Sequence, residues 1–439
     1  MTNTRRDFLG QSVGSMAAAS LFAATATAAD QTAGTAEPLP VAVIGPGGMG
    51  MAHVNQLAGN SAVRVTYICD VDSDRAAKAA ETVTQHSGHL PKIVSDMRRV
   101  FDDKLIKAVW IATPDHWHAP AAILAANAGK HVYVEKPCSH NLREGRLMID
   151  AARKNNVVMQ VGTQSRSTPF IAAALEKMNS GVIGEILVAK AWNSQIRGNI
   201  GRQKPSQPPK NLDYDLWLGP VTERPYQANF LHSIWRWWYD FGCGDIGNDG
   251  IHDIDIARWG LGVNSHPSRI AALGGKSFFD DDQQHADTQF VAFEYPGMTK
   301  SGKPKQLIFE QRIWSPYVQE GLENGNAFYG TAGMMILGKS GKFRLTGPKN
   351  KLIEESSGAG PDLAAHHQNF LDCIRTGKRP NADIEINHLS TSLCHLGNIA
   401  TRTGRVINFD PTSETIREDN DATKLLTREY RDHWAKPTV

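Results

Sequence analysis

From residue 39 to residue 161 the chain alternates between short apolar runs and longer stretches with a helical spacing of apolar positions. The apolar runs are rich in β-branched residues, which predicts buried strands at 39–44, 63–69, 107–112, 132–134 and 157–161. Helices are expected at 51–58, 119–128 and 141–154. Strands joined by helices form right-handed crossovers, so the pattern predicts an α/β fold with a doubly wound parallel sheet of Rossmann type over residues 39–165.

The pattern changes after residue 165. A helix is expected at 171–178 and an irregular, proline-rich section at 197–225. Strands are expected at 185–196, 268–278, 288–295, 306–313 and 334–337. Two helices within 362–405 complete a predicted α+β domain over residues 166–405, with an open, mostly antiparallel sheet. Residues 406–439 are expected to form a C-terminal tail, and the cleft between the two domains should hold a substrate.

The N-terminus carries the features of an export signal. Arg5 and Arg6 precede a short apolar stretch at 13–22 and an alanine-rich end at 23–29. The apolar stretch is too short to span a bilayer, and with Phe8 and Leu9 the pattern resembles a twin-arginine signal. We expect a signal peptide over 1–29 and a linker over 30–38. The resemblance implies that the twin-arginine export machinery carries the folded chain to the periplasm or another extracytoplasmic compartment.

Composition narrows the classes of function. Lys and Arg total 47 against 45 Asp and Glu, a net charge of +2 without a concentrated basic face, which argues against a nucleic-acid partner. No run of about 18 apolar residues occurs, so no membrane span is expected in the mature protein. The five cysteines are scattered and form no CxxC pair, which predicts buried thiols rather than disulfides or structural zinc.

The first predicted strand leads into a glycine-rich turn and then a helix. In a GxGxxG turn the first glycine permits the tight turn, the second lets the backbone approach a pyrophosphate, and the third lets helix and strand pack closely. Free N–H groups and the helix dipole favour phosphate at the start of the helix. The sequence therefore predicts a dinucleotide site made by Gly45, Gly47, Gly48, Met49 and Gly50.

An acidic residue, Asp70, follows the second predicted strand, twenty residues beyond Gly50. An acidic side chain at this place accepts hydrogen bonds from the adenosine ribose and repels a 2′-phosphate, which favours NAD over NADP. Arg75 could neutralise such a phosphate, so NADP stays the lesser alternative. The other interpretation of Asp70 is an ordinary turn residue at a strand end.

Lys136, within Glu135-Lys136-Pro137, stands at the end of the strand predicted at 132–134. Ligands of parallel sheets bind at the carboxyl ends of strands, and Thr113-Pro114 and Gly162-Thr163-Gln164 end neighbouring strands. Beside a cationic nicotinamide the pKa of a lysine is lowered, so its amine can polarise an alcohol oxygen. A surface lysine before a turn proline is the alternative interpretation.

These motifs, in this order, resemble the glucose–fructose oxidoreductase, inositol dehydrogenase and MocA (Gfo/Idh/MocA) family. The resemblance rests on residues 45–50, 113–118, 135–137 and 242–252, and it runs from about residue 39 to about residue 405, closest to exported members with a twin-arginine signal. It implies that Lys136 lies between nicotinamide and substrate, that the Lys136–Pro137 peptide is cis, and that His252 is a catalytic acid/base. It also implies that the helices of 362–405 pack back on the Rossmann domain.

The expected site is then as follows. The catalytic residues are Lys136 and His252, because an imidazole with a pKa of about 6.5 suits proton transfer at neutral pH. Besides the glycine turn and Asp70, the residues expected at the cofactor are Thr113, Pro114, His118, Glu135 and Lys136. The residues expected at the substrate are Gln164, Arg166, Arg236, Asn248, Asp249 and His252.

One position departs from the family pattern, because Asn248 stands where the family has an aspartate four residues before the histidine. An amide can hydrogen-bond a hydroxyl but cannot accept a proton, and whether Asp245 or Asp249 compensates stays open. No metal is expected. The weaker alternative is a metal site that uses His252, Asp249 and Asp255, with His116 and His118 elsewhere.

The run at 232–241 is unusually aromatic, and two interpretations of it are equally weighted. Tryptophan faces stack on the apolar faces of sugar rings, which would place the run in a carbohydrate pocket. The same residues could instead pack a domain or subunit interface.

Together these features predict an exported oxidoreductase that acts on a hydroxyl or keto group of a sugar, polyol or glycoside. Free nicotinamide nucleotides are scarce outside the cytoplasm, so NAD should be tightly bound and a second substrate should take the hydride back. A redox-neutral NAD-dependent glycosidase, which the intact Glu-Lys-Pro argues against, and a non-catalytic sugar-binding relative are the alternatives. Open sheets of this kind often pair between subunits, so a homo-oligomer is expected.

Overall fold

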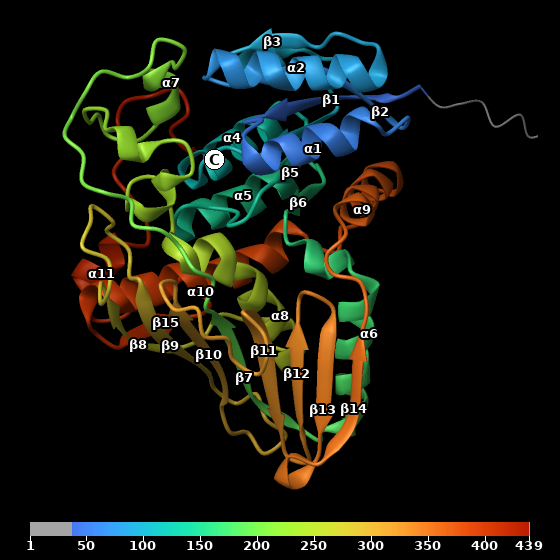
Figure 1. Cartoon of the computed structure of the whole chain (residues 1–439), viewed down its shortest axis with the longest axis vertical. Coiled ribbons are helices and arrows are strands. Elements are labelled where there is room, and N and C mark those ends of the chain that lie inside the picture. The colour runs from blue at the N-terminus through green and yellow to red at the C-terminus, as the bar shows by residue number, and fades with distance from the viewer. Residues whose placement is uncertain (1–36, 439) are drawn as a thin grey trace, which may run out of the picture. The chain divides into compact units, whose positions relative to one another are not determined.

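The structure is a computed structural model that describes residues 37–438, and this part of the chain contains two sheets (Figure 1). The predicted signal peptide and nearly all of the predicted linker lie outside the described residues. No helix of the described part has the length and apolar character needed to cross a bilayer.

The first sheet has six strands, all parallel, in the order β3-β2-β1-β4-β5-β6. Its strands are β1 (Leu39–Ile44), β2 (Val63–Cys69), β3 (Lys92–Val94), β4 (Ala108–Ile111), β5 (His131–Val134) and β6 (Met159–Val161). Ile44 pairs with Cys69 on one side and Ile111 on the other, and Ile111 pairs with Val134. The predicted Rossmann sheet is thus confirmed, and the residues that follow β1, β2, β4 and β5 share one edge.

Five helices cover this sheet: α1 (Gly48–Ala58), α2 (Ser73–Ser87), α3 (Arg98–Asp102), α4 (Asp115–Asn127) and α5 (Leu142–Lys154). Helix α4 begins at Asp115 rather than at the predicted 119, with Pro120 inside it. A proline cannot donate to the carbonyl four residues earlier, which is that of His116. Arg428 from the C-terminal segment donates to that oxygen instead, at 2.8 Å, so a distant contact permits the longer helix.

The second sheet has ten strands in the order β14-β13-β12-β11-β7-β10-β9-β8-β15-β16, antiparallel except where β7 and β10 pair. The strands are β7 (Ile186–Asn193), β8 (Arg269–Gly275), β9 (Thr288–Tyr295), β10 (Lys305–Arg312), β11 (Asn324–Gly330), β12 (Met334–Gly338), β13 (Lys342–Thr346), β14 (Leu352–Ser357), β15 (Ile407–Asp410) and β16 (Thr415–Ile416). The mostly antiparallel sheet was predicted. Strands β11, β13 and β14 were not, because their glycine and polar residues give no apolar run. Strands β15 and β16, which are short, were also not predicted.

The helices of this part are α6 (Pro169–Lys177), α7 (Tyr214–Leu218), α8 (Ile251–Leu261), α9 (Leu363–Thr376), α10 (Ile384–Thr403) and α11 (Asn420–Lys424). Short 3-10 or π turns are η1 (Gln164–Ser167), η2 (Met178–Val182), η3 (Ala228–Phe230), η4 (Ile234–Trp237), η5 (Ile246–Gly250) and η6 (Pro348–Asn350). Helices α8 and α10 lie between the two sheets (Figure 1). Phe370 and Leu371 of α9 pack in the core of the first sheet with Val41 and Val43.

Residues 406–438 are folded rather than a loose tail. They form β15, β16 and α11 and then an extended segment that contacts the Rossmann domain. Trp434 packs against Trp117 of α4, and Arg428 forms an ion pair with Glu144 of α5 at 2.8 Å. The five cysteines are buried and free, as predicted from their spacing.

Candidate active site

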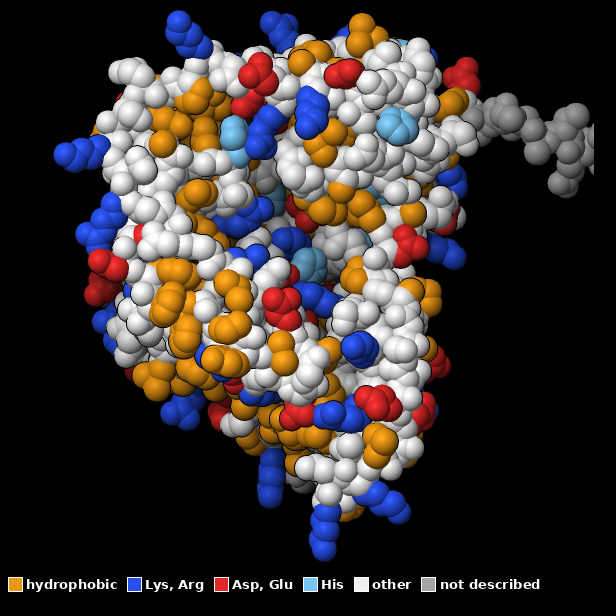
Figure 2. Space-filling view, in the orientation of Figure 1, with side chains coloured by type: hydrophobic (Ala, Val, Ile, Leu, Met, Phe, Trp, Pro, Cys, Tyr) orange, Lys and Arg blue, Asp and Glu red, His pale blue; other side chains and the backbone are white. Residues whose placement is uncertain are grey.

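A pocket of about 360 Å³ lies along the carboxyl edge of the first sheet. One wall is made by residues that follow β1, β2, β4 and β5, and the opposite wall comes from residues 211–236, a segment we name the cover. The face of the molecule is hollowed here, with Lys, Arg and His side chains inside the hollow (Figure 2). The cover includes the end of the irregular section at 197–225, which carried no sequence motif, and the start of the aromatic run at 232–241.

The glycine turn after β1 fits a pyrophosphate. Gly45 has a φ of +79°, and a Cβ on Gly50 would lie 2.1 Å from the carbonyl oxygen of Gly45. Nothing lies within 4 Å of a Cβ placed on Gly48, and no side chain caps the start of α1. The first N–H groups of a helix have no acceptor within it, so this end is open to an anion. The predicted cradle is therefore present in the structure.

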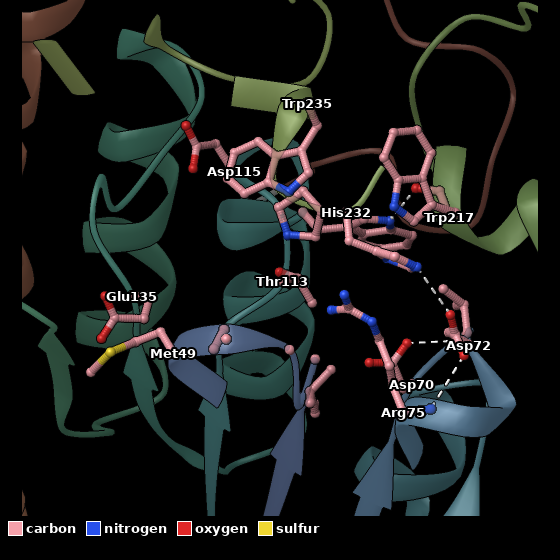
Figure 3. A pocket seen from close by; sticks show the side chains of 18 of the residues that line it. Met49, Asp70, Asp72, Arg75, Thr113, Asp115, Glu135, Trp217, His232 and Trp235 are labelled. Atoms are coloured by element: carbon pink, nitrogen blue, oxygen red, sulfur yellow. Dashed lines mark hydrogen bonds and ion pairs between the residues drawn. The ribbon is translucent and has the colours of Figure 1, made fainter. Parts of the chain in front are cut away.

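The far end of the pocket carries charges of both signs. Burial raises the pKa of Asp70 to about 6, despite a hydrogen bond from the Asp72 N–H and the nearby Arg75. The Arg75 guanidinium points into the pocket (Figure 3), and a Cβ on Gly47 would lie 2.6 Å from its Nη1. An acid for ribose hydroxyls and a cation at the phosphate cradle thus both line the groove.

The buried Asp72 fastens the cover over this groove (Figure 3). Its carboxylate caps α2 by accepting from the N–H groups of Asp74 and Arg75, at 3.0 and 3.2 Å. It also accepts from Asn211 Nδ2 at 3.0 Å and lies 3.3 Å from His232 Nε2. One side chain therefore links the start of a Rossmann helix to two separate points of the cover.

The predicted catalytic lysine lies where two pockets meet. Lys136 lines both the cofactor groove and a second pocket of about 570 Å³. The Lys136–Pro137 peptide is cis, and Nζ donates to the backbone oxygen of Asn248 at 2.5 Å. Burial and the nearby Arg236 lower the pKa of the ammonium, against the opposing charge of Glu135.

A buried chain of polar groups supports Lys136 from behind. Glu135 accepts from His53 Nε2 at 3.1 Å and from the backbone N–H of Lys136 at 3.2 Å. Burial would raise the pKa of Glu135, but the hydrogen bond and charge of His53 and the charge of Lys136 lower it to about 2. His53 Nδ1 lies 2.9 Å from His367 Nε2, which also accepts from Trp110. The chain ties the lysine to α1 and α9.

His252 does not have the ordinary imidazole pKa that the sequence analysis assumed. Burial, then the charges of Lys136 and Lys339, lower its pKa to about 3. The ring is therefore neutral at neutral pH and is a weak base. An imidazole with so low a pKa is a poor proton acceptor, and Lys136, whose pKa burial also lowers, is the titratable group whose charge acts on it first.

Asn248 is held by charged groups on two sides. Its Oδ1 accepts from Arg236 Nε at 2.8 Å, and its Nδ2 donates to Asp245 Oδ1 at 2.8 Å. Asp245 is fully buried and also pairs with Arg197 at 3.0 Å. The amide thus supplies an acceptor and a donor at once, which an aspartate could not do.

The neighbouring Asp249 forms part of a second ionic group that the sequence did not predict. Lys339, at the β12–β13 turn, pairs with Asp249 at 3.0 Å and with Asp253 at 2.9 Å. Burial opposes its charge, but the two carboxylates raise the pKa of Lys339 above its usual range. A turn of the second sheet thereby fixes the start of α8, on which His252 stands.

Three residues predicted to contact substrate do not line the two pockets described above: Gln164, Arg166 and His252. Gln164 is buried and donates to Glu135 at 3.3 Å, and Arg166 forms a buried ion pair with Asp255 at 2.7 and 2.8 Å. The polar atoms of Gln164 and Arg166 thus have partners within the protein. The chain that follows β6 packs directly against Glu135 at Gly162. His252 lies within the electrostatic reach of Lys136.

The remaining predicted cofactor residues lie along the groove. Thr113, Pro114 and His118 line it together with the glycine turn. His118 bridges two strand ends through the carbonyl oxygens of Thr113 and Pro137, at 2.8 and 2.7 Å. Thr113 Oγ1 is buried without a hydrogen-bond partner in the described part of the chain, which leaves it available to a bound ligand.

The aromatic run contributes to both pockets and to a packed cluster. Trp235 lines the cofactor groove and Trp237 lines the second pocket. Trp238 packs in a cluster with Phe230, Phe241 and Trp217, which gives the cover a core of its own. The run therefore supplies side chains to the walls of both pockets and to the aromatic cluster that packs beside them.

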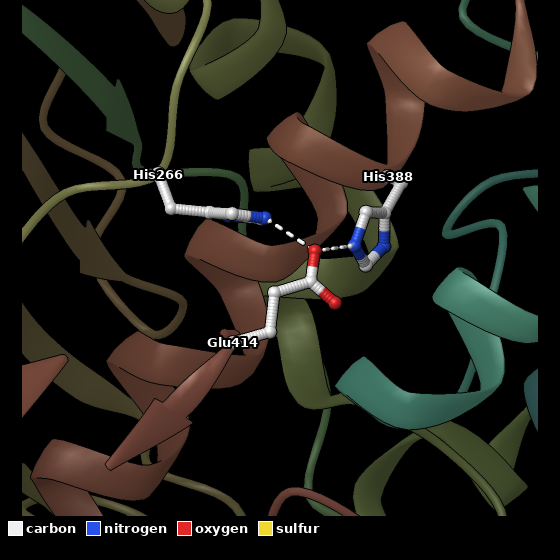
Figure 4. A group of neighbouring side chains, drawn as sticks. All are labelled: His266, His388 and Glu414. Atoms are coloured by element: carbon white, nitrogen blue, oxygen red, sulfur yellow. Dashed lines mark hydrogen bonds and ion pairs between the residues drawn. The ribbon is translucent and has the colours of Figure 1, made fainter. Parts of the chain in front are cut away.

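A group of possible metal ligands lies outside both pockets. His266 and His388 each place Nε2 at 2.9 Å from Glu414 Oε1 (Figure 4). Arg146 also donates to this carboxylate. Burial would raise the pKa of Glu414, but these three partners outweigh it and hold the pKa far below its usual range. The group joins the β15–β16 turn to α10 and α5, with its charges already compensated.

A Rossmann sheet with a phosphate cradle, a half-buried lysine at its strand ends and a second polar pocket defines a dinucleotide-dependent oxidoreductase. The profile described as "Oxidoreductase family, NAD-binding Rossmann fold" matches residues 39–163. The profile described as "Oxidoreductase family, C-terminal alpha/beta domain" matches residues 183–293 and 330–436. The chain belongs to the Gfo/Idh/MocA oxidoreductase family, as the sequence motifs indicated, and its first domain is the NAD-binding domain of that family.

Similar proteins include sugar and polyol dehydrogenases. The scyllo-inositol 2-dehydrogenase (NAD(+)) of Bacillus subtilis is 32% identical over 358 residues, 77% of this chain and 87% of that protein. Levoglucosan dehydrogenase of Pseudarthrobacter phenanthrenivorans is 32% identical over 232 residues, which are 51% of this chain and 51% of that protein. This match therefore spans about half of each chain. A solved levoglucosan dehydrogenase, in complex with NADH and levoglucosan, has a TM-score of 0.64 at 20% identity and covers 84% of this chain and 99% of that one. This last likeness shows the fold.

Proposed function

We propose that the protein oxidises a secondary hydroxyl of a sugar or polyol to a ketone with NAD, and catalyses the reverse reduction. The observation that carries this proposal is the position of Lys136, at the point where the cofactor groove meets the second, polar pocket. The inositol and levoglucosan dehydrogenases among its relatives support the substrate class. Asp70 supports NAD over NADP as cofactor, and Arg75 is the residue to vary in testing that preference.

When bound, NAD accepts a hydride from the carbon that carries the hydroxyl. Lys136 hydrogen-bonds the hydroxyl oxygen and, in its neutral form, accepts the proton. His252, a neutral imidazole, donates a hydrogen bond from its one N–H to the hydroxyl oxygen and so orients the hydroxyl. Glu135 and the oxygen of Asn248 hold the lysine in place, and Trp235 and the rest of the cover exclude water from the groove.

We also propose that NAD is held tightly and that the protein works outside the cytoplasm. The cover supports tight binding, because the groove lies between it and the sheet and its anchor Asp72 is buried. The proposal of export rests on the resemblance of residues 1–29 to a twin-arginine signal. The C-terminal segment adds a second fastening, since Arg431 donates to the backbone oxygen of Gly219 and pairs with Asp215 in the cover. A protein that retains its cofactor needs a second substrate to return the hydride.

The test begins with purified, folded protein expressed from the full chain. Mass spectrometry of small molecules released on denaturation should find NAD or NADH at near one per chain. Adding a panel of sugars and polyols should convert bound NAD to NADH, and a keto sugar should appear among the products. An empty protein would contradict tight binding. Release of an aglycone with an unchanged sugar would indicate a redox-neutral glycosidase, and binding without any chemistry would indicate a non-catalytic protein.

A further inference from the structure

The wall shared by the two pockets contains an arginine with a free edge. Arg236 extends from η4, and its guanidinium lies over the Trp235 ring at 4.3 Å. Nε donates to Asn248 Oδ1 and Nη1 donates to the backbone oxygen of Ser233, both at 2.8 Å. Nη2 has no hydrogen-bond partner within residues 37–438. Both fixed bonds hold the plane of the guanidinium, so the direction of its free edge is set before any ligand binds.

Its charge meets no carboxylate in direct contact. No carboxylate of the described residues forms an ion pair with Arg236, and its two bonds go to neutral oxygens. The buried carboxylates of Asp115 and Asp245 act on it only through space. Asp115 accepts from the backbone N–H of Cys243, and Asp245 is shared by Arg197, Asn193 and Asn248. Removing a cation from water without a counter-charge is costly, so a pocket of this kind favours an anionic ligand.

A second cation faces the same neutral residue. Lys136 donates to the backbone oxygen of Asn248 while Arg236 donates to its side-chain oxygen, and neither has a carboxylate partner in the described part of the chain. The pocket in front of them measures about 570 Å³ and also offers Gln195 and Asn199 as neutral hydrogen-bonding groups. The other charged residues that line it, Arg197 and Asp249, form ion pairs within the protein. A monosaccharide fits such a volume, and the two cations would meet the same end of it.

We propose that the substrate is a sugar acid, whose carboxylate binds the free edge of Arg236 while a neighbouring hydroxyl binds Lys136. This inference rests on the proposed function and names its substrate class. A carboxylate matches one guanidinium edge, whereas a phosphate dianion would call for several convergent donors. The neutral Asn248 is essential to this selectivity, because a carboxylate at the same place would neutralise Arg236 from within the protein.

The experiment compares matched pairs of acid and neutral sugar on the NAD-loaded protein: D-galacturonate with D-galactose, and D-glucuronate with D-glucose. Isothermal titration calorimetry gives affinity, and the rise in NADH absorbance gives kcat/KM. A charge-assisted bidentate contact should favour the acid by about tenfold or more in each measurement. D-glucose 6-phosphate is included to distinguish carboxylate from phosphate.

Three variants sharpen the test. Arg236→Gln removes the anchor, and Asn248→Asp, which keeps the shape of the side chain, neutralises it; both should lower the acid-to-neutral ratio about tenfold. Arg202→Gln changes an exposed arginine outside both pockets and should leave the ratio unchanged. Melting temperature and NAD content establish that each variant is folded.

The outcomes distinguish failure of the sugar-acid inference from failure of the proposed oxidoreductase function. Preference for the acid that disappears in Arg236→Gln and Asn248→Asp supports it. Neutral sugars bound and oxidised as well as the acids would overturn the inference and leave the proposed function intact, and so would a stronger response to the sugar phosphate. If no sugar of either kind is oxidised although NAD is bound, the proposed function fails, and the calorimetric ratio alone then decides whether the anion site exists.

Discussion

Replacing Asp72 with alanine should free the cofactor. The carboxylate makes two kinds of contact, and their energies can be estimated separately. Loss of the cap on α2 costs about 1 kcal/mol of folding stability. Loss of the hydrogen bond from Asn211 and of the contact with His232 Nε2 costs up to about 1 kcal/mol each, or up to about 2 kcal/mol of attachment of the cover to the Rossmann domain. If the cover limits release, 2 kcal/mol corresponds to dissociation of NAD about 30-fold faster.

The assay loads the protein with NAD, adds an excess of a labelled analogue, and follows the exchange with time. Asp362→Ala is the matched control, because Asp362 caps α9 through the N–H groups of Ala364 and Ala365 and makes no contact with the cover. Both variants should lose similar stability, and only Asp72→Ala should exchange NAD faster. Equal exchange rates in the two variants would refute the idea that the cover retains the cofactor.

Three further predictions follow from the same contacts. Lys136→Met should keep bound NAD but slow its reduction in a single turnover by about 100-fold or more, and an unchanged rate would remove Lys136 from the chemistry. Arg166→Met leaves the buried carboxylate of Asp255 without its cation and should cost about 3–5 kcal/mol in urea unfolding, with Arg166→Lys as the milder control. Acidification should destabilise the protein from about pH 6.5 downward, by up to about 1.4 kcal/mol per pH unit for each buried histidine. Acid destabilises the folded state because burial lowers the pKa of these histidines in it, so the unfolded chain takes up protons first. Thermal melts between pH 8 and pH 4 would check this dependence. A flat profile would contradict the pKa values of about 3 for His116, His285 and His395 and about 4 for His366.

The parts of the site that the sequence predicted are those that depend on local backbone. The glycine turn, Asp70 and Lys136 each directly follow a strand, so their place at the sheet edge follows from the alternation of strands and helices. The start of helix α4 was not predicted, because Pro120 leaves the carbonyl oxygen of His116 without a donor in the helix. The group that donates to this oxygen is Arg428, far along the chain.

The cover and the ionic support of α8 could not be predicted, for a related reason. His232 and Asn211 meet Asp72 only when the chain folds back, and nothing in the proline-rich section marks its target. Lys339 lies in a turn between two strands and has no motif around it. Burial also gives two of the predicted site residues surroundings that their sequence neighbours do not indicate. His252 is a weak base in its environment, and Arg166 is an internal partner of Asp255.

The five buried thiols have a consequence for how the fold can be observed. Burial raises the pKa of each of Cys69, Cys138, Cys243, Cys373 and Cys394, so in the folded protein they are both hidden and protonated. A thiol reagent reacts with the thiolate, and reaction therefore waits for the chain to open. Because the cysteines lie in different parts of the fold, with Cys69 in β2, Cys373 in α9 and Cys394 in α10, the order in which they become labelled, read by peptide mapping, would give the sequence in which parts of the molecule come apart.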